Sequence, residues 1–343
     1  MEKLYLKRLI LIIMILPLFF IGACSNRTAS GMGAEQINLK IGINLDEDSS
    51  HGEASKLFKE RVEELSEGRL NVQLYPNQQL GDMRAQIEQV QSGALEMTIQ
   101  GTSTLSNFAK PLEIIELPFL FPDEEVMWEV LSGETGQEIL SELENVNMVG
   151  LSYFSQGFRH ITADIPIKSP EDIKGIKFRT MPSDLLINTW SNWGANAVSV
   201  DLGELYNGLQ QGVVDSEDNN LETIKKLSLY EVQDYLTISG HNFLSFAIVT
   251  NKDWFEGLPE DLQEIVREAA MEAGKYSVDY MLESDKESFE TLSEEMTVYE
   301  LTDEEKEVFR EASRALYEKY SSNGKNKAYI DKIIEAVENA TSN

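Results

Sequence analysis

From Asn38 onward, the sequence alternates short strand patterns with amphipathic helix patterns, and this order restricts the fold more than any other feature. The stretch that starts at Asn38 and the stretch Arg69–Tyr75 alternate apolar with polar residues, which is the period of a half-buried strand. Ala54–Glu67 and Asp82–Ser92 instead carry apolar residues at helical spacing, and Gly93 is placed to end the second helix. Repeated strand–helix order predicts an α/β fold with an open, mostly parallel sheet that helices cover on both faces.

A second α/β unit is predicted from Met148 onward, and the chain of 343 residues is long enough for two cores. This unit has a strand at Met148–Phe154, a helix start at Ser169 with proline next to it, and a strand that carries Arg179. A later apolar strand, Phe243–Thr250, could return to the first sheet and complete it. Both predicted domains are therefore discontinuous in sequence.

The segment from Pro259 to about Met296 keeps a helical pattern without a further proline, well beyond the usual length of a globular helix. One interpretation is a single long helix that braces both domains. The alternative is a pair of helices broken near Gly274. Behind it, Thr302 and Glu305 are spaced for a capping box at the start of an amphipathic helix.

The N-terminus has the features of an export signal. Basic residues precede an apolar run from Leu9 to Ile21, which is short for a membrane span and suits a signal peptide. Gly22 and Ala23 in front of Cys24, the only cysteine, resemble the lipobox of bacterial lipoproteins, so we expect Cys24 to be lipidated. Residues 1–23 are then a signal peptide and residues 24–36 a tether. The predicted location is extracytoplasmic, anchored to the cell membrane.

The balance of charge argues against a nucleic-acid partner. The chain carries 59 acidic and 29 basic residues, for a net charge of −30. The predicted signal peptide contains three basic residues and one acidic residue, so the mature chain would carry −32. Such a surface repels nucleic acid and anionic lipid, and an anionic ligand would need a locally positive pocket.

Motifs for catalysis or metal binding are absent from the sequence. The three histidines are isolated, and there is no HExxH, zinc cysteine pair, GxSxG, P-loop or GxGxxG. Two acidic clusters, at Asp46–Gly52 and Asp215–Asn220, lack the glycine and the glutamate of a calcium loop. We therefore expect no enzyme activity, no cofactor and no metal. The absence of these motifs does not exclude an enzyme that needs only two carboxylates, such as a glycosidase.

Arg179 and two tryptophans are the side chains whose role the patterns leave open. In the strand around Arg179, Ile176 and Phe178 point to one face and the charged residues to the other. Arg179 could be a solvated charge or the anchor of an anionic ligand. Trp190 and Trp193 share one helix face, which favours core packing, with a place in a ligand cleft as the alternative.

Several blocks together resemble the solute-binding receptors of TRAP transporters, which are tripartite, ATP-independent, ion-coupled importers of organic acids. The main blocks are GFRHIT (Gly157–Thr162), SPEDIKGIKFRT (Ser169–Thr180), WGANAVSVDLGELYNGLQQGVVD (Trp193–Asp215) and DNN (Asp218–Asn220). Supporting blocks are LYPNQQLGD (Leu74–Asp82), ELPFLF (Glu116–Phe121), SLYEVQDYLTISGH (Ser228–His241) and LPEDLQEIVREAA (Leu258–Ala270). The resemblance extends from Asn38 to about Lys319.

The resemblance implies a two-lobed, periplasmic-binding-protein-like α/β fold with hinge strands and a long helix that spans both lobes. We expect lobe I at 37–155 plus 243–290 and lobe II at 156–242 plus 291–343. In this family Arg179 matches the arginine that holds the ligand carboxylate, Arg159 a second arginine of the cleft, and Asn219 an orienting asparagine. Further positions that could line the ligand are Asn44, His51, Gln79, Asp82, Gly101, Trp193, Asp218 and His241.

The resemblance leaves the ligand open. The family usually has DGQEN where this chain has DSEDN at Asp215–Asn219, which brings an extra carboxylate toward the cleft and favours a ligand with hydroxyls. Gly101 and Thr104 differ from the sialic acid receptors, so that ligand is not expected. Candidates are C4-dicarboxylates and sugar acids such as hexuronates, bound by a monomer that delivers them to a membrane permease. The alternatives are a secreted carbohydrate-active enzyme with paired carboxylates and a ligand-sensing subunit of a signalling system.

Overall fold

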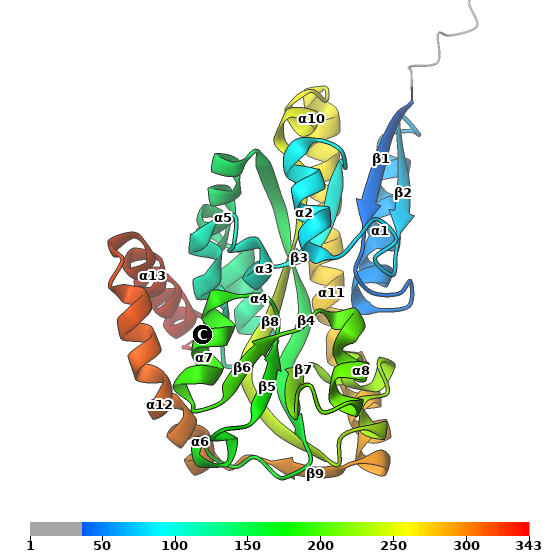
Figure 1. The fold of residues 1–343 in the computed structure, drawn as a ribbon. Coiled ribbons are helices and arrows are strands. Elements are labelled where there is room, and N and C mark those ends of the chain that lie inside the picture. The colour runs from blue at the N-terminus through cyan, green and yellow to red at the C-terminus, as the bar shows by residue number, and fades with distance from the viewer. Residues whose placement is uncertain (1–35, 343) are drawn as a thin grey trace, which may run out of the picture. The chain divides into compact units, whose positions relative to one another are not determined.

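The computed structural model describes residues 36–342. The predicted signal peptide, the tether and Cys24 lie outside the described residues, apart from the last tether residue, Gln36. The described chain folds around one nine-stranded sheet with the order β2-β1-β3-β8-β4-β7-β5-β6, and β9 pairs with β8 (Figure 1). The strands are β1 (Ile37–Gly42), β2 (Leu70–Tyr75), β3 (Met97–Gly101), β4 (Met148–Ala163), β5 (Lys177–Thr180), β6 (Asn196–Ser199), β7 (Ser216–Asn219), β8 (Tyr235–Asn251) and β9 (Thr297–Glu300).

The first lobe is built on β1, β2 and β3 and on the adjoining halves of β4 and β8. β1 pairs in parallel with β2 and β3, while β3 pairs antiparallel with β8. Asp82 caps the start of α2, and Gly93 ends it in the left-handed conformation, as the sequence predicts. The helices of this lobe are α1 (Ser50–Leu65), α2 (Met83–Ser92), α3 (Thr102–Leu105), α4 (Glu124–Ser132), α5 (Glu134–Leu140) and α10 (Lys252–Glu256).

The second lobe is built on β5, β6, β7 and β9 and on the other halves of β4 and β8. β5 lies parallel to both β6 and β7, and β9 is parallel to β8. Its helices are α6 (Pro170–Ile173), α7 (Asp184–Asn192), α8 (Leu205–Gln210) and α9 (Leu221–Lys226). The whole sheet is therefore mixed, and helices flank it, which confirms the predicted fold class.

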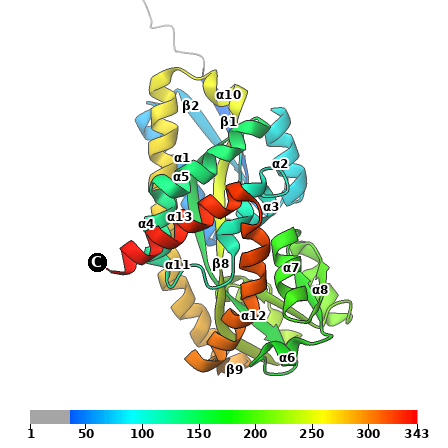
Figure 2. The same ribbon diagram turned by 90° about the vertical axis from the view of Figure 1, so that its left-hand side faces the viewer.

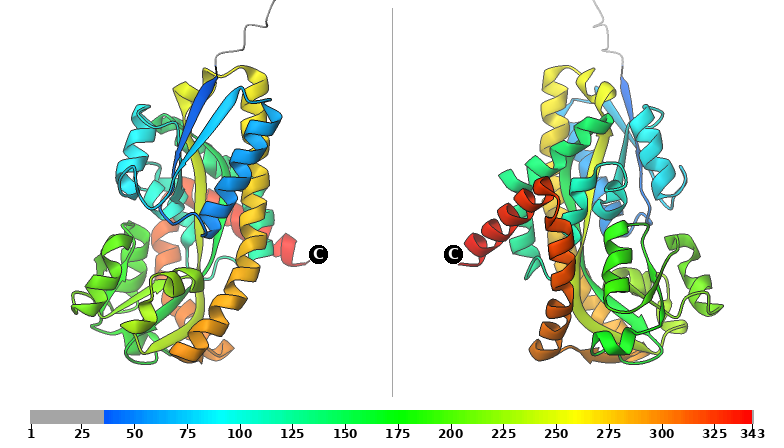
Figure 3. Two further views of the ribbon diagram at one scale, coloured as in Figure 1. Left: turned by 90° about the vertical axis from the view of Figure 1, so that its right-hand side faces the viewer. Right: turned by 60° about the vertical axis from the view of Figure 1, so that its left-hand side comes forward.

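β4 and β8 connect the two lobes because both strands are long enough to belong to each (Figure 3). They pair antiparallel from Met148 with Asn251 to Ala163 with Tyr235. The pairing is interrupted between Ser155 and Phe158 and again between Arg159 and Ile161. Such bulges bend a strand and increase its local twist, so the sheet changes direction where it passes from one lobe to the other.

Helix α11 (Glu260–Glu295) is one continuous helix of 36 residues, as the single-helix interpretation expected. It buries Val266 in the apolar core of the first lobe and Leu292 in that of the second. Figure 3 shows it running beside both halves of the sheet. Gly274 does not break it; instead, a Cβ there would collide with Ser152 and with the backbone oxygen of Tyr153 on β4. Glycine allows the helix to approach the sheet closely.

The last two helices, α12 (Asp303–Ser321) and α13 (Gly324–Thr341), pack on different parts of the molecule (Figure 2). The capping box of Thr302 and Glu305 starts α12, and Phe309 packs in the second-lobe core. α13 lies against α4 and α5 of the first lobe, where Ile330 and Ile333 are buried. The sequence led us to expect residues 291–343 in lobe II. Within that range, α13 instead buries its apolar face in the first-lobe core.

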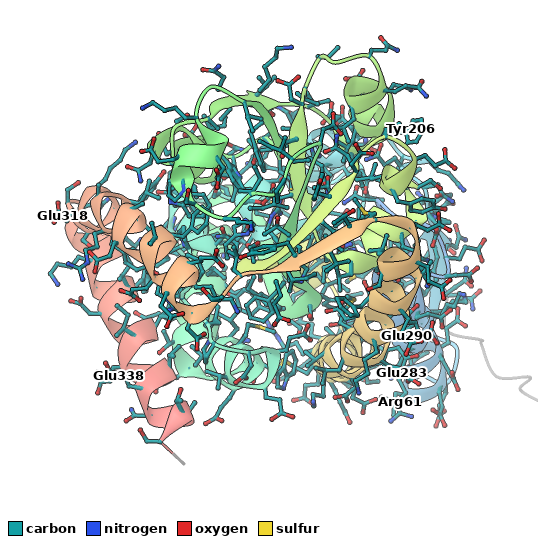
Figure 4. All side chains as sticks on the ribbon, turned by 90° about the horizontal axis from the view of Figure 1, so that it is seen from below. Arg61, Tyr206, Glu283, Glu290, Glu318 and Glu338 are labelled. Carbon is teal, nitrogen blue, oxygen red and sulfur yellow. The ribbon has the colours of Figure 1, made fainter. Side chains whose placement is uncertain are left out.

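Several acidic side chains lie on the exterior. Glu283 and Glu290 on α11, Glu318 on α12 and Glu338 on α13 are exposed and project outward in Figure 4. No helix within residues 36–342 is both long and apolar enough to cross a membrane.

Candidate ligand-binding site

A small cavity of about 20 Å³ lies where the two lobes meet. Both lobes and the connecting strands line it with Asn44, Leu45, Met83, Gln156, Leu244, Phe246, Arg179, Met181, Leu202, Asn219 and Thr223. A groove of about 220 Å³ adjoins it and shares four of these residues, Asn44, Leu45, Leu202 and Thr223. The smaller cavity is the stronger candidate site because it contains a buried cation.

That cation is Arg179, which sits on β5 with no exposed surface. Its Nε donates a hydrogen bond to the backbone oxygen of Val200 at 2.9 Å, which fixes the plane of the guanidinium. Both terminal nitrogens, Nη1 and Nη2, are buried and have no hydrogen-bond partner. Burial lowers the pKa of Arg179 to about 10, so the group stays charged at neutral pH. Two parallel donors on a charged, planar group fit a carboxylate.

Arg159, the second predicted arginine, has a different environment. Its Nε and Nη2 bind the two carboxylate oxygens of Asp218 at 2.5 and 2.9 Å, and Nη2 also reaches the backbone oxygen of Asp218. The remaining nitrogen, Nη1, lies 3.4 Å from the sulfur of Met181. Arg159 is thus not among the cavity-lining residues, and Met181 stands between it and the cavity.

His241 completes this buried ion-pair network. Its Nε2 lies 3.2 Å from Asp218 Oδ2, and its Nδ1 lies 2.7 Å from the hydroxyl of Ser239. Burial alone would raise the pKa of Asp218, but the charge of Arg159 and the hydrogen bond with His241 hold it below its usual range. Asp218 and His241 therefore support Arg159 from behind the cavity wall.

Asn219 lines the cavity, and the neighbouring Glu217 is buried next to it. Asn219 Nδ2 donates to Glu217 Oε2 at 2.5 Å, and the hydroxyl of Thr162 donates to Oε1 at 3.0 Å. Burial raises the pKa of Glu217 to about 7, although the positive charge of Arg179 opposes that shift. Burial thus favours the protonated form of the Glu217 carboxyl group.

Other predicted residues meet at the first-lobe side. Asn44 lines the cavity and is held by hydrogen bonds to the backbone oxygen of Ile99 and to Gln100. Gly101 ends β3, and a Cβ there would lie 3.1 Å from Met181. His51 is buried behind the cavity with its ring centroid 4.2 Å from that of Phe246. Burial lowers the pKa of His51 to about 3, so the ring is neutral.

The remaining predicted residues do not reach the cavity. Gln79 and Asp82 are exposed, and Asp82 serves as the N-cap of α2. Trp193 packs edge-on against Trp190 in the second-lobe core, and its Nε1 donates to the hydroxyl of Ser313. Core packing, the favoured interpretation of this pair, describes the position of Trp193 better than a place in the cleft.

Sequence reasoning missed most of the apolar lining. Met83, Met181, Leu244 and Phe246 carry the same signal as ordinary core residues, so no pattern marks them for a ligand. Gln156 could have been found, since a polar residue inside an apolar strand is unusual, but its position depends on the bulge at Ser155–Phe158.

The two lobes also contact each other beside the cavity. On one side, Lys226 of α9 binds Asp46 at 2.9 Å. On the other, Lys110 binds Asp184 at 2.6 Å, and Asn107 donates to the backbone oxygen of Pro182. Within residues 36–342, no group of three or more His, Cys, Asp or Glu side chains is placed to hold a metal ion.

Comparison with known proteins places this geometry in a family. Residues 41–323 match the family model DctP, described as bacterial extracellular solute-binding protein, family 7. The C4-dicarboxylate-binding periplasmic protein DctP of Rhodobacter capsulatus is 30% identical over 281 residues, which are 81% of this chain and 84% of that protein.

Solved structures agree with the sequence match. The sugar acid binding protein DctPAm of Advenella mimigardefordensis, in complex with galactonate, has a TM-score of 0.84 and 31% identity, covering 89% of this chain and 99% of the other. A TRAP periplasmic solute-binding protein of Shewanella oneidensis with bound succinate has a TM-score of 0.83 and 27% identity, covering 88% and 99%. Members of this family are binding proteins that serve transport. The resemblance found in the sequence is confirmed, and the chain belongs to the DctP family of bacterial extracellular solute-binding proteins, the receptors of TRAP transporters.

Proposed function

We propose that this protein is the extracytoplasmic receptor of a TRAP-type importer, which captures a small organic acid by closure of its two lobes and delivers it to the membrane permease. The observation that carries this proposal is Arg179, a buried and charged guanidinium whose two terminal nitrogens have no partner and which lines the cavity. A ligand carboxylate would supply both missing acceptors.

The buried arginine also explains why an acid is selected over a neutral molecule. A buried charged group without hydrogen bonds is costly, and a neutral ligand cannot offset its desolvation. Removing one partner of such a buried charged pair weakens the binding free energy by about 2–5 kcal/mol. A micromolar ligand binds with a total of about −8 kcal/mol, so loss of the arginine would remove useful affinity.

Relatives indicate the class of acid. The Rhodobacter protein is named for C4-dicarboxylates, and the Advenella structure contains galactonate. We infer that the ligand of this chain is a C4-dicarboxylate or a sugar acid such as a hexuronate. Asn219 would orient the carboxylate on Arg179 from the neighbouring strand, β7.

Location and partners complete the proposal. Cys24 would carry a lipid that anchors the mature protein to the cell membrane, and residues 24–36 would act as a tether. The receptor would act as a monomer, without a cofactor and without catalysis. Closure would create the surface that the permease recognises.

A thermal-shift panel tests this function. The full chain and the variant Arg179→Ala would be heated with dicarboxylates, uronates, aldonates, keto acids and neutral sugars. A ligand at 100 times its Kd adds about 2.7 kcal/mol of apparent stability, a shift of a few degrees. We expect at least one acid to stabilise the wild-type protein but not Arg179→Ala, while Arg69→Ala, at an exposed ion pair with Asp261, responds like wild type. An Arg179→Ala protein that still responds, or turnover of an oligosaccharide, would argue against the proposal.

A further inference from the structure

A second groove, of about 480 Å³, lies against the connecting strands on the side of the molecule that Figure 2 faces. Phe158 and His160 of β4 line it, whereas Arg159 between them points at Met181 in the wall of the ligand cavity. The groove and the cavity therefore lie on opposite sides of β4. Its volume is within the range of about 300–1,000 Å³ that is typical of small-molecule sites.

Parts of both lobes form the walls of this groove. The first lobe contributes the loop at 119–122 and the end of α13, and the second lobe contributes α12. The floor consists of β4 and β8, and α11 closes the far side. Figure 2 shows α11 and α12 on either side of β8, with α13 crossing above them. A molecule in the groove would thus contact both lobes at once.

His160 supplies a buried hydrogen-bond donor to the groove. The side chain has 7% of its surface exposed, and burial lowers its pKa to about 3, so the ring is neutral. Its Nδ1 accepts a hydrogen bond from the backbone N–H of Gly240 at 3.2 Å, which places the ring proton on Nε2. Among the described residues, Nε2 has no hydrogen-bond partner. Buried donors are normally paired, so this N–H is available to an acceptor in the groove.

Two cations of α12 lie on the same wall. Lys306 and Arg310 are four residues apart, so they share one face of the helix. The charge of Lys306 helps to lower the pKa of His160, which places the ammonium close to the ring. Within residues 36–342, no hydrogen bond or ion pair engages this ammonium. The guanidinium of Arg310 lies 5.1 Å from the ring centroid of Phe119 and 3.4 Å from the exposed Glu307. Donors without matching acceptors fit an anion.

The other walls restrict which anion fits. Asp285 of α11 is the one acid among the described residues that line the groove, and burial raises its pKa to about 7. Because it lies across from α12, it confines the charged end of a ligand to the α12 wall. Most of the remaining lining is apolar and includes Leu120, Phe121, Phe158, Ile238 and Val337. A ligand would therefore need an anionic group at one end and an apolar body.

The groove is also connected to the buried network behind the cavity. Gly240, which donates to His160, lies between Ser239 and His241 on β8. The hydroxyl of Ser239 lies 2.7 Å from Nδ1 of His241, and Nε2 of His241 lies 3.2 Å from Asp218. A molecule bound to His160 would thus hold the segment of β8 that supports the arginines of the cavity.

We propose that this groove is a second ligand site, which takes a carboxylate with an apolar body and whose occupation favours the closed arrangement of the lobes. The carboxylate accepts from His160 Nε2 and pairs with Lys306, while the aliphatic or aromatic body packs between the loop at 119–122 and α13. A ligand that binds the arrangement described above stabilises it, so its binding raises the affinity of the cavity for its acid. The site itself does not depend on the proposed function, whereas this effect on acid binding rests on it.

Calorimetric titration of the full chain carrying Arg179→Ala tests the site separately, because this variant removes the carboxylate anchor proposed for the cavity. The probes at pH 7 are octanoate, phenylacetate, the uncharged octanamide, and acetate, which has no apolar body. We expect octanoate or phenylacetate to bind at least tenfold more tightly than octanamide and acetate. Octanamide binding as tightly as octanoate would overturn the role of the charge, and no binding by either apolar acid would overturn the site.

Lys306 can be tested without touching the core. In the Arg179→Ala background, we expect Lys306→Met to weaken octanoate binding at least fivefold and Lys306→Arg to retain it. Lys319→Met is the matched control, since Lys319 is an exposed lysine of α12 that does not line the groove, and it should not change octanoate binding. Equal losses for Lys306→Met and Lys319→Met would show that octanoate binds elsewhere.

The effect on the cavity is measured with Arg179 in place. The best-binding acid of the thermal-shift panel is titrated into wild type and Lys306→Met, each with and without octanoate at the concentration that saturates the groove. We expect octanoate to raise the acid affinity of wild type at least threefold relative to its effect on Lys306→Met, which also corrects for competition at Arg179. An unchanged or weaker relative affinity would overturn the coupling. If no acid binds wild type but octanoate still binds the Arg179→Ala chain, the proposed function fails and the second site stands.

Discussion

Two fully buried arginines of the second lobe, Arg159 and Arg179, differ in what they bind. Arg159 is satisfied by Asp218, whereas Arg179 keeps two unpartnered nitrogens at the cavity. Burying an ion costs several kcal/mol unless a partner compensates it. Arg159 is therefore part of the folded framework, and in the proposed function Arg179 would be held for a ligand at the expense of stability.

Substitution by methionine should separate these roles. Arg159→Met leaves Asp218 buried without its partner, and we expect the free energy of unfolding to fall by about 3–5 kcal/mol. Arg179→Met removes an unpaired charge from an apolar wall, so stability should stay within about 1 kcal/mol of wild type or rise while acid binding is lost. Urea unfolding at pH 7 measures both. Equal destabilisation by the two substitutions would show that Arg179 is structural.

Glu217 predicts a pH dependence of stability. Its pKa in the folded protein, raised to about 7 by burial, lies above the ordinary value of 4.5. Between these values the folded protein retains a proton that the unfolded chain has lost, so the free energy of unfolding falls as the pH rises through this window. Glu217→Gln removes this loss, and we expect it to be more stable than wild type at pH 8 by on the order of 2 kcal/mol, with little difference at pH 4.5.

Urea unfolding across this pH range measures the effect, with the exposed Glu318→Gln as control. A difference between Glu217→Gln and wild type that does not grow with pH would contradict the assignment. Besides burial, the charge of Asp218 on β7 raises the pKa of Glu217, while Arg179 on β5 and the hydrogen bonds of Asn219 and Thr162 lower it.

At the residue scale, the sequence predicted polar side chains of the site better than its walls. Arg179 could be named because a charged residue at the end of a strand is conspicuous, whereas Asn219 and Asn44 were named from the family resemblance. The structure brings all three to one cavity. The pairing of Arg159 with Asp218 could not be predicted, since it depends on the register between β4 and β7. Phe246 and Met181 look like core residues in any pattern of hydrophobicity.

At the scale of elements, helix α11 and strands β4 and β8 connect the lobes. Spacing in the sequence predicted helix throughout α11, because the pattern persists without proline, but it left open a break near Gly274. It predicted only part of β4 and of β8. The expected strand Met148–Phe154 continues to Ala163, and the expected strand Phe243–Thr250 begins earlier, at Tyr235. Bulges break the period of two there, so periodicity cannot follow a strand through them.

Gly274 provides a test of how closely α11 must approach β4. We expect Gly274→Ala to destabilise the protein by about 1–3 kcal/mol, because the added methyl collides with the backbone of β4. Gly324→Ala, at the start of α13, meets no atom within 4 Å and should be neutral or slightly stabilising. Thermal unfolding of both variants measures the difference. A stabilising Gly274→Ala would mean that the helix lies farther from the sheet.

At the scale of the whole described structure, contacts between the lobes set the affinity together with the ligand. Lys226 with Asp46 and Lys110 with Asp184 join the lobes on the two sides of the cavity. Both pairs are partly exposed, so each should contribute only about 0.2–1 kcal/mol. The ligand, rather than these pairs, must supply most of the free energy that keeps the lobes closed.

Lys226→Met should therefore weaken acid binding by at most about fivefold, and the effect should shrink at high salt as screening increases. Lys275→Met removes a lysine whose partner, Asp279, lies on the same helix, and it should not change affinity. Calorimetric titration at low and high ionic strength measures both variants. If Lys226→Met and Lys275→Met lost the same amount of affinity, the contact between the lobes would have no special role in binding.

The central claim is that the cavity holds a ligand carboxylate on Arg179, and a crystal structure of the protein with its best-binding acid tests it most directly. The account predicts both carboxylate oxygens at about 2.7–3.2 Å from Nη1 and Nη2 of Arg179, with the pair of Arg159 and Asp218 intact behind Met181. A carboxylate bound elsewhere, with the terminal nitrogens of Arg179 still unpartnered, would contradict it.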